Sequence, residues 1–178
     1  MDCDGSEACG GLARLKKPLM IARRQLAVQQ VLAHYVRAHD RRDGAAMAAL
    51  FTPQGRVEIS YNNAGELEPL GELVGREPIA NAVVHVMKPH PPLGWSHNAT
   101  DGLLIEIDGD RATVDAQFMV FNILGAEKPN TGWPKDAHGA QGTITPIESG
   151  YYRQNLVRVN GTWLIESLRI THNLPMAF

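Results

Sequence analysis

The sequence predicts a single α+β domain, because an amphipathic helical pattern comes first and two long pairs of alternating strands come last. The chain has 178 residues, of which 44% are hydrophobic and 20% are charged. This length and composition are typical of one globular domain. Residues 1–20 show no sustained period and predict a mobile leader, so residues 21–178 are expected to form the domain itself.

The first half of the domain predicts three helices. Between Ile21 and His39 the apolar residues recur at spacings of three and four, which is the period of an amphipathic helix. Asp43 is placed to cap a second, short helix over residues 45–51. A third helix is expected over residues 75–87, where Pro78 occupies the first turn.

The remaining residues predict antiparallel strands. A strand that includes Val57, Ile59 and Tyr61 enters a hairpin, and apolar residues alternate over 103–120 on either side of an Asp-Gly-Asp turn. A second long hairpin is expected over 152–173, around the Asn160-Gly161 turn. The Gly- and Pro-rich connection from Gly125 to Thr145 is long enough to be a lid, an oligomer contact or a disordered insertion.

Charge and motif content exclude several classes of function. The net charge is −2, from 17 Lys and Arg against 19 Asp and Glu, and the charges are scattered, so nucleic acid is not an expected partner. Cys3 and Cys9 fit neither a zinc knuckle nor a disulfide framework, which favours a reducing cytoplasm. No apolar run reaches the roughly 20 residues of a membrane span.

Cofactor motifs are also missing from the sequence. There is no His-Glu-x-x-His metal pattern, no Gly-x-Gly-x-x-Gly dinucleotide pattern and no phosphate-binding loop. We therefore expect no metal and no cofactor. The scattered charges favour a neutral small molecule or a protein as the partner.

The order of the elements carries a resemblance to a known family. The features that carry it are Tyr35, Asp40 to Gly44, Leu50-Phe51, the turn at 107–110 and the segment Val159 to Ile165. In this order the chain resembles the SnoaL-like branch of the nuclear-transport-factor-2-like superfamily. The resemblance implies helices packed on a strongly curved, mostly antiparallel sheet, a cone that encloses a pocket. It also implies a hydrophobic small molecule as the partner, and a homodimer or a higher homo-oligomer.

The resemblance further implies a catalytic set. Dehydratases and dehydrochlorinases of this branch pair a buried His with an Asp at the end of the first helix, with a Tyr one turn earlier, and the matching positions are His97, Asp40 and Tyr35. An Asp that accepts a hydrogen bond from one imidazole nitrogen leaves the other nitrogen free as a base. The plainer interpretation stays open: Asp40 ends a helix, Tyr35 is core and His97 is a strand residue.

Strand alternation predicts the walls of the pocket. Leu168, Ile170 and His172 share one face of the last strand, and Tyr152 faces the cavity from its neighbour. Phe118 and Val120 are expected to complete the wall. His172 is a second candidate acid or base, although a histidine near the end of the chain is equally compatible with solvent exposure.

These observations lead to one functional hypothesis and its alternatives. The hypothesis is a cofactor-independent lyase or isomerase, with dehydration as the first choice, acting on a steroid, a polyketide, a terpenoid or a similar oxygenated molecule. His97 would remove the proton, Asp40 would orient it, and Tyr35 would donate a hydrogen bond to the substrate oxygen. The alternatives are a non-catalytic binding or assembly module and a protein like the small subunit of ring-hydroxylating dioxygenases.

Overall fold

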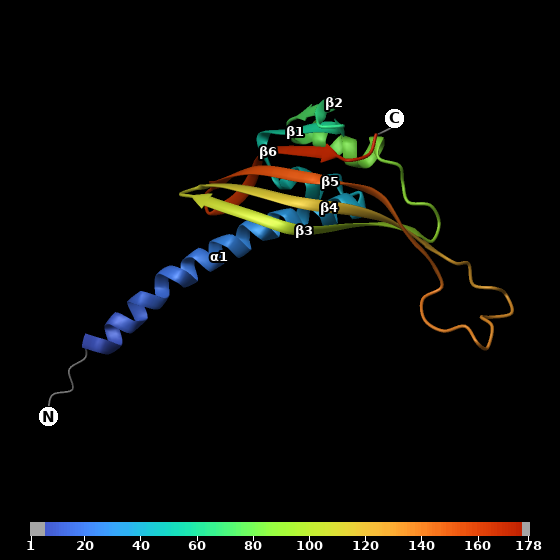
Figure 1. Ribbon diagram of the computed structural model, residues 1–178, viewed down its shortest axis with the longest axis horizontal. Coiled ribbons are helices and arrows are strands. Elements are labelled where there is room, and N and C mark those ends of the chain that lie inside the picture. The colour runs from blue at the N-terminus through green and yellow to red at the C-terminus, as the bar shows by residue number, and fades with distance from the viewer. Residues whose placement is uncertain (1–5, 176–178) are drawn as a thin grey trace.

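The computed structural model describes residues 6–175 of the chain, with side chains described from residue 18 onward. The α+β class is confirmed, since the helices precede most of the sheet and cover one side of it (Figure 1). The elements, in chain order, are α1 (Ser6–Arg41), α2 (Gly44–Ala49), β1 (Phe51–Asn63), β2 (Glu66–Val74), α3 (Arg76–Asn81), the π-helical turn η1 (Ala82–Val86), β3 (Gly94–Asp108), β4 (Arg111–Gly125), β5 (Gly142–Val159) and β6 (Thr162–His172).

The six strands form one mixed sheet in the order β2-β1-β6-β5-β4-β3. All neighbours are antiparallel except β1 and β6, which run parallel. The sheet is an open, twisted layer and is not strongly curled, so the strongly curved cone that we expected is not what the structure shows (Figure 1). Alternation in a sequence reports which residues share a face of a sheet, but it does not report how far the sheet bends.

Helix α1 is longer than predicted. It begins at Ser6, so most of the predicted leader is helical, and its N-terminal half extends away from the sheet (Figure 1). Leu19 and Met20 are 54% and 62% exposed, whereas Val28 is fully buried. The amphipathic pattern therefore begins where α1 meets the sheet. The preceding residues show no sustained apolar period in the sequence, so periodicity alone does not predict that they are helical.

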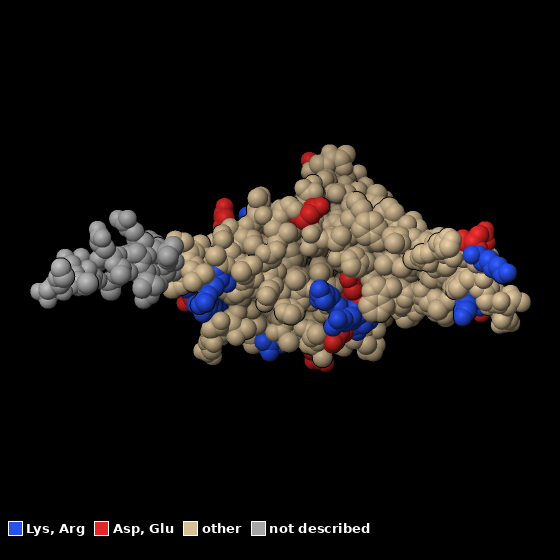
Figure 2. All heavy atoms as spheres, turned by 90° about the horizontal axis from the view of Figure 1, so that it is seen from below, with Lys and Arg blue, Asp and Glu red and all other residues tan. Residues whose placement is uncertain are grey.

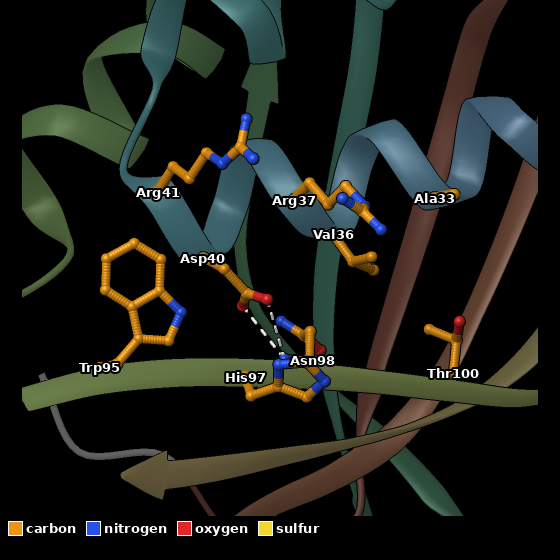
Figure 3. A pocket seen from close by; sticks show the side chains of 9 residues that line it. All are labelled: Ala33, Val36, Arg37, Asp40, Arg41, Trp95, His97, Asn98 and Thr100. Carbon is orange, nitrogen blue, oxygen red and sulfur yellow. Dashed lines mark hydrogen bonds between the residues drawn. The ribbon is translucent and has the colours of Figure 1, made fainter. Parts of the chain in front are cut away.

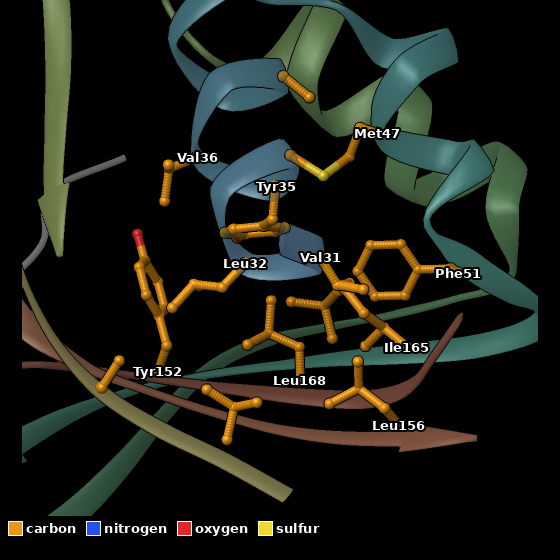
Figure 4. Close-up of a cluster of buried hydrophobic side chains, with 14 of the residues drawn as sticks. Val31, Leu32, Tyr35, Val36, Met47, Phe51, Tyr152, Leu156, Ile165 and Leu168 are labelled. Atoms are coloured by element: carbon orange, nitrogen blue, oxygen red, sulfur yellow. The ribbon is translucent and has the colours of Figure 1, made fainter. Parts of the chain in front are cut away.

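The core lies between the second half of α1 and the central strands. Leu32 and Tyr35 from α1 pack against Leu156, Ile165 and Leu168 from β5 and β6 (Figure 4). The spacing of three and four along α1 places its apolar residues on the side that faces the sheet. This packing holds the C-terminal turn of α1 at a fixed height above the sheet.

The short helices follow the predicted signals. The Asp43 carboxylate accepts a hydrogen bond from the backbone N–H of Ala46 at 2.9 Å, which confirms the predicted cap of α2. The predicted third helix is present as α3 followed by η1. Among the described residues, no helix is both long and apolar enough to cross a membrane.

The connection between β4 and β5 projects beyond the ends of the strands (Figure 1). It is shorter than predicted, because β4 continues to Gly125 and β5 begins at Gly142. Backbone hydrogen bonds tie its base together, from Ala126 N–H to Gln141 O at 3.0 Å and from Gly125 N–H to Leu93 O at 2.9 Å. In this structure the connection extends away from the body and covers none of it.

Candidate functional site

The C-terminal turn of α1 is fixed by contacts to its last carbonyl groups. Arg42 adopts a left-handed backbone conformation (φ 56°) that ends the helix, and its Nη1 donates to the carbonyl of His39 at 2.6 Å. The ring of His90 lies with Nε2 2.7 Å from the carbonyl oxygen of Asp40. These contacts satisfy carbonyl groups that have no partner inside the helix, and they hold Asp40 in place.

The carboxylate of Asp40 is buried against strand β3. The residue is 6% exposed, and both carboxylate oxygens lie 3.1 Å from the backbone nitrogen of Asn98, which donates its hydrogen to them (Figure 3). The nearest imidazole nitrogen is Nδ1 of His39, at 3.7 Å from Oδ1. Within the described residues, no Lys or Arg lies within ion-pair distance of this carboxylate. Asp40 is thus a buried acid with spare hydrogen-bonding capacity.

Asn98 connects three polar side chains of the site. Its Nδ2 lies 3.0 Å from Nδ1 of His39, and the hydroxyl of Tyr152 donates to its Oδ1 at 3.2 Å. Since the amide nitrogen can only donate, Nδ1 of His39 is the acceptor in this arrangement. The backbone N–H of the same residue holds Asp40. Asn98 therefore fixes His39, Asp40 and Tyr152 relative to one another.

Two tyrosines lie behind this network in the core. The rings of Tyr35 and Tyr152 meet edge to face with centroids 5.4 Å apart, and Phe118 stacks on Tyr152 at 4.3 Å. Burial is the main cause that raises the pKa of both phenols, and the negative charge of Glu148 adds to it. Both phenols therefore stay neutral at physiological pH, and the hydroxyl of Tyr152 donates to Asn98.

A second acid and imidazole, Glu148 of β5 and His172 of β6, lie together near Phe118. Nδ1 of His172 is 2.9 Å from Oε1 of Glu148, although the two atoms are not aligned for a hydrogen bond. At this distance the carboxylate attracts the imidazole whenever the ring is protonated, because an ion pair needs proximity more than direction. Phe118 approaches His172 edge on, with centroids 5.8 Å apart. His172 is buried, not exposed at the chain end.

A groove of about 370 Å³ lies between α1 and β3 and brings Asp40 to its surface (Figure 3). Asp40 and His97, both predicted as site residues, line it, whereas Tyr35 is not among its lining residues. The groove is lined by Ala33, Val36, Arg37, Asp40, Arg41, Trp95, His97, Asn98 and Thr100.

The predicted contact between Asp40 and His97 is not made. Successive residues of β3 point to opposite faces, and the side chain that points to the interior beside α1 is Asn98, so the neighbouring His97 points outward and is exposed. The imidazole that does lie beside Asp40 belongs to His39. His97 shares the groove with Asp40 without pairing with it.

The residues predicted as pocket wall lie in the core. Phe118, Val120 and Leu168 are buried, and Ile170 packs partly buried against the same cluster. None of these four lines the groove. They hold the inner face of the sheet on which the polar network is built, while the wall of the groove comes from α1 and β3.

Sequence reasoning missed Asn98 and Glu148. Neither residue belongs to a motif that points to a reaction, and the role of Asn98 depends on which face of β3 meets α1. In the part of the chain that the structure describes, no three His, Cys, Asp or Glu side chains gather as a metal site would require. The site thus consists of a buried acid, two histidines and a hydrogen-bonded amide.

The chain belongs to the SnoaL-like domain family, whose sequence profile it matches over residues 21–169. No curated protein matches it. Among solved structures it is similar to a protein of unknown function from Mycobacterium tuberculosis, with 21% identity over 88% of this chain and 76% of the other and a TM-score of 0.61.

Two further structures share the fold. One is provisionally described as the beta subunit of an aromatic-ring-hydroxylating dioxygenase from Novosphingobium aromaticivorans, with 16% identity over 88% and 94% of the two chains and a TM-score of 0.65. The other is a hexachlorocyclohexane dehydrochlorinase, with 16% identity over 90% and 93% and a TM-score of 0.60. At these identities the likeness establishes the NTF2-like fold of this chain and not its reaction.

Proposed function

We propose that this protein is a cofactor-independent lyase or isomerase that moves a proton on a hydrophobic, oxygenated small molecule bound in the groove. The observation that carries the proposal is the position of Asp40, whose buried carboxylate lines the groove and has no Lys or Arg within ion-pair distance among the described residues. The dehydrochlorinase with the same fold supports an elimination reaction. A polyketide, a terpenoid or a steroid is the expected kind of substrate.

The geometry shifts the role of base from His97 to Asp40. Because the two side chains do not touch, Asp40 cannot orient the imidazole as we expected, and it faces the substrate directly. Asp40 accepts the proton from a carbon next to a carbonyl group, and the electron pair of that C–H bond forms the new double bond. The leaving C–O bond breaks, and the departing oxygen takes a proton from solvent at the open mouth of the groove to leave as water.

The polar network behind Asp40 prepares it for this step. A carboxylate that is buried and accepts from only one backbone N–H retains lone pairs for a proton. Asn98 holds the carboxylate, and the neutral hydroxyl of Tyr152 holds Asn98. Tyr35 acts through its contact with Tyr152 and does not donate to the substrate.

Deuterium exchange tests the base without requiring the natural substrate. The probe is 2-tetralone, an aromatic ketone with acidic C1 protons, incubated with the protein in D2O and followed by proton NMR. We expect wild-type protein to accelerate exchange and Asp40→Asn to lower the protein-dependent rate about 100-fold or more, the scale of a general base. His97→Gln should keep exchange within a few-fold, since exchange involves no departing oxygen. If a folded Asp40→Asn variant exchanged the protons at the wild-type rate, Asp40 would not be the base.

A second candidate function is a binding or assembly module without catalysis. The solved structure that is described as a dioxygenase beta subunit favours it, because that chain has the same fold and serves as one subunit of a larger enzyme. Failure of the wild-type protein to accelerate exchange, together with tight binding of the same ketone, would support this function over the enzyme.

We also propose that the protein forms a homo-oligomer in the cytoplasm. Met119 and Tyr151 are 42% and 45% exposed on the face of the sheet that the helices leave uncovered. Apolar side chains in such a position favour contact with a second copy. Light scattering after gel filtration should give a multiple of the chain mass of 19.5 kDa, and a mass equal to one chain would contradict the oligomer.

A further inference from the structure

We infer that the ligand of the groove is a planar aromatic or conjugated molecule that carries a carboxylate or another planar anion. This inference rests on the proposed function only in placing the ligand beside Asp40. It is carried by Trp95 and by two arginines of α1 that line the same groove, Arg37 and Arg41.

Trp95 offers a ring surface that is held in place from one side. Its indole stacks on the ring of His90, with centroids 4.9 Å apart and an interplanar angle of 24°. His90 is in turn bound to the carbonyl oxygen of Asp40, at the end of α1. Trp95 nevertheless remains 43% exposed and lines the groove. A fixed, half-exposed indole stacks on a flat ring with little loss of side-chain entropy.

The two arginines supply positive charge that the protein itself does not neutralise. Arg37 and Arg41 stand four residues apart, on neighbouring turns of α1, and both are exposed. Across the described residues, no carboxylate lies within 4.0 Å of either guanidinium, in contrast to Arg24 on the same helix, which pairs with Asp110 at 3.7 Å. A guanidinium binds a carboxylate through two parallel hydrogen bonds.

The formal charges of the groove residues favour the binding of one monovalent anion. Two arginines and the carboxylate of Asp40 give a formal charge of +1 when His97 is neutral. Along the groove the order is Trp95, then Asp40, then Arg37 and finally Thr100 (Figure 3). A ring stacked on Trp95 and a carboxylate bound at Arg37 would therefore place the atoms between them beside Asp40, where the proton transfer is proposed.

The size of the groove limits the size of the ligand, and charged groups of both signs lie close together on the surface. Figure 2 shows blue and red atoms together near the middle of one face, in an otherwise mostly tan surface. The volume of about 370 Å³ lies at the lower end of the range for small-molecule sites, which fits one or two fused rings with a short substituent. Larger ligands would extend beyond the groove into solvent.

Calorimetric titration with three matched probes tests the inference. The probes are 2-naphthoate, its neutral analogue 2-naphthylmethanol and its saturated analogue decahydro-2-naphthoate, all at low ionic strength. We expect 2-naphthoate to bind at least about tenfold more tightly than either analogue, because only it combines a flat ring with a charge. Equal affinity for all three probes, or no detectable binding of 2-naphthoate, would overturn the inference.

Variants test whether the two arginines bind the carboxylate of the ligand and whether Trp95 binds its flat ring. The double variant Arg37→Gln/Arg41→Gln should weaken 2-naphthoate at least about tenfold and leave 2-naphthylmethanol unchanged. Trp95→Leu should weaken both flat probes, and Trp95→Phe should retain most of the affinity. Arg23→Gln, an exposed arginine of α1 outside the groove, is the control for net charge. Unchanged binding of 2-naphthoate to the double arginine variant would contradict the assignment.

The binding result is separable from the proposed reaction. If 2-naphthoate binds as expected but the protein does not exchange the protons of 2-tetralone, the groove is a binding site and the proposed chemistry is wrong. If exchange depends on Asp40 but 2-naphthoate and its neutral analogue bind equally, the chemistry stands and the anionic ligand is wrong.

Discussion

Replacement of Asn98 by Ala should destabilise the protein, because it leaves the buried hydroxyl of Tyr152 without a hydrogen-bond partner. The variant removes the side-chain hydrogen bonds to His39 and Tyr152 but keeps the backbone N–H that binds Asp40. The hydroxyl of Tyr152, which is buried, then has no partner, at a cost of about 1–3 kcal/mol, and the lost hydrogen bond to His39 adds about 1 kcal/mol. We expect the free energy of unfolding to fall by about 2–4 kcal/mol.

A double-mutant cycle with Tyr152→Phe isolates the contact. Tyr152→Phe alone removes the buried hydroxyl together with its bond to Asn98 and should cost about 1 kcal/mol. In the double variant no hydroxyl is left without a partner, so its cost should be at least about 1 kcal/mol less than the sum of the single variants. Urea unfolding, followed by circular dichroism at 222 nm, measures all four proteins. Additivity of the two costs would refute the hydrogen bond between the hydroxyl and the amide.

Two further predictions concern the core behind the site. A methyl group at Gly150 would overlap the carbonyl of Thr171 and lie 2.8 Å from the ring of Phe118, so Gly150→Ala should lower the unfolding free energy by about 3 kcal/mol or more, in the range of overpacked cores. Gly71→Ala, where nothing lies within 4 Å, is the matched control, and equal melting temperatures for the two variants would contradict the packing. Raised phenol pKa values make Tyr35 and Tyr152 bind protons more tightly in the folded protein than in the unfolded one. Their contribution to stability is therefore complete below the ordinary pKa of 10.0 and is lost as the pH rises above it. Tyrosinate absorbance from these two residues should appear at 295 nm only together with loss of the circular dichroism signal, and its appearance in the intact fold would contradict their burial.

Much of the fold follows from local patterns in the sequence. The apolar spacing from Val28 onward predicts the buried face of α1, Asp43 predicts the cap of α2, and Asn160-Gly161 predicts the turn between β5 and β6. In each case neighbouring residues decide the conformation through backbone preference or periodic burial. The first part of α1 has no such periodic pattern in its sequence, so periodicity predicts the helix only from Ile21 onward.

The site was predicted only in part, for a reason that lies in strand geometry. The position of Asp40 follows from the end of α1, but its partner depends on which residue of β3 faces inward. A shift of one residue exchanges the two faces of a strand, so the same segment presents either His97 or Asn98 to the helix. The sequence holds no signal that settles this choice, since β3 lies at the edge of the sheet and its contact with α1 is non-local.

The position of bound 2-naphthoate tests most directly whether the groove beside Asp40 is the ligand site. Nuclear Overhauser effects between bound 2-naphthoate and the protein report which side chains lie within about 5 Å of its ring protons. We expect contacts to the indole of Trp95 and the methyl group of Thr100, and their loss in the variant Trp95→Leu. Contacts to Leu156 and Leu168 in the core, with none to Trp95, would show that the ligand enters the interior and that the groove beside Asp40 is not the site.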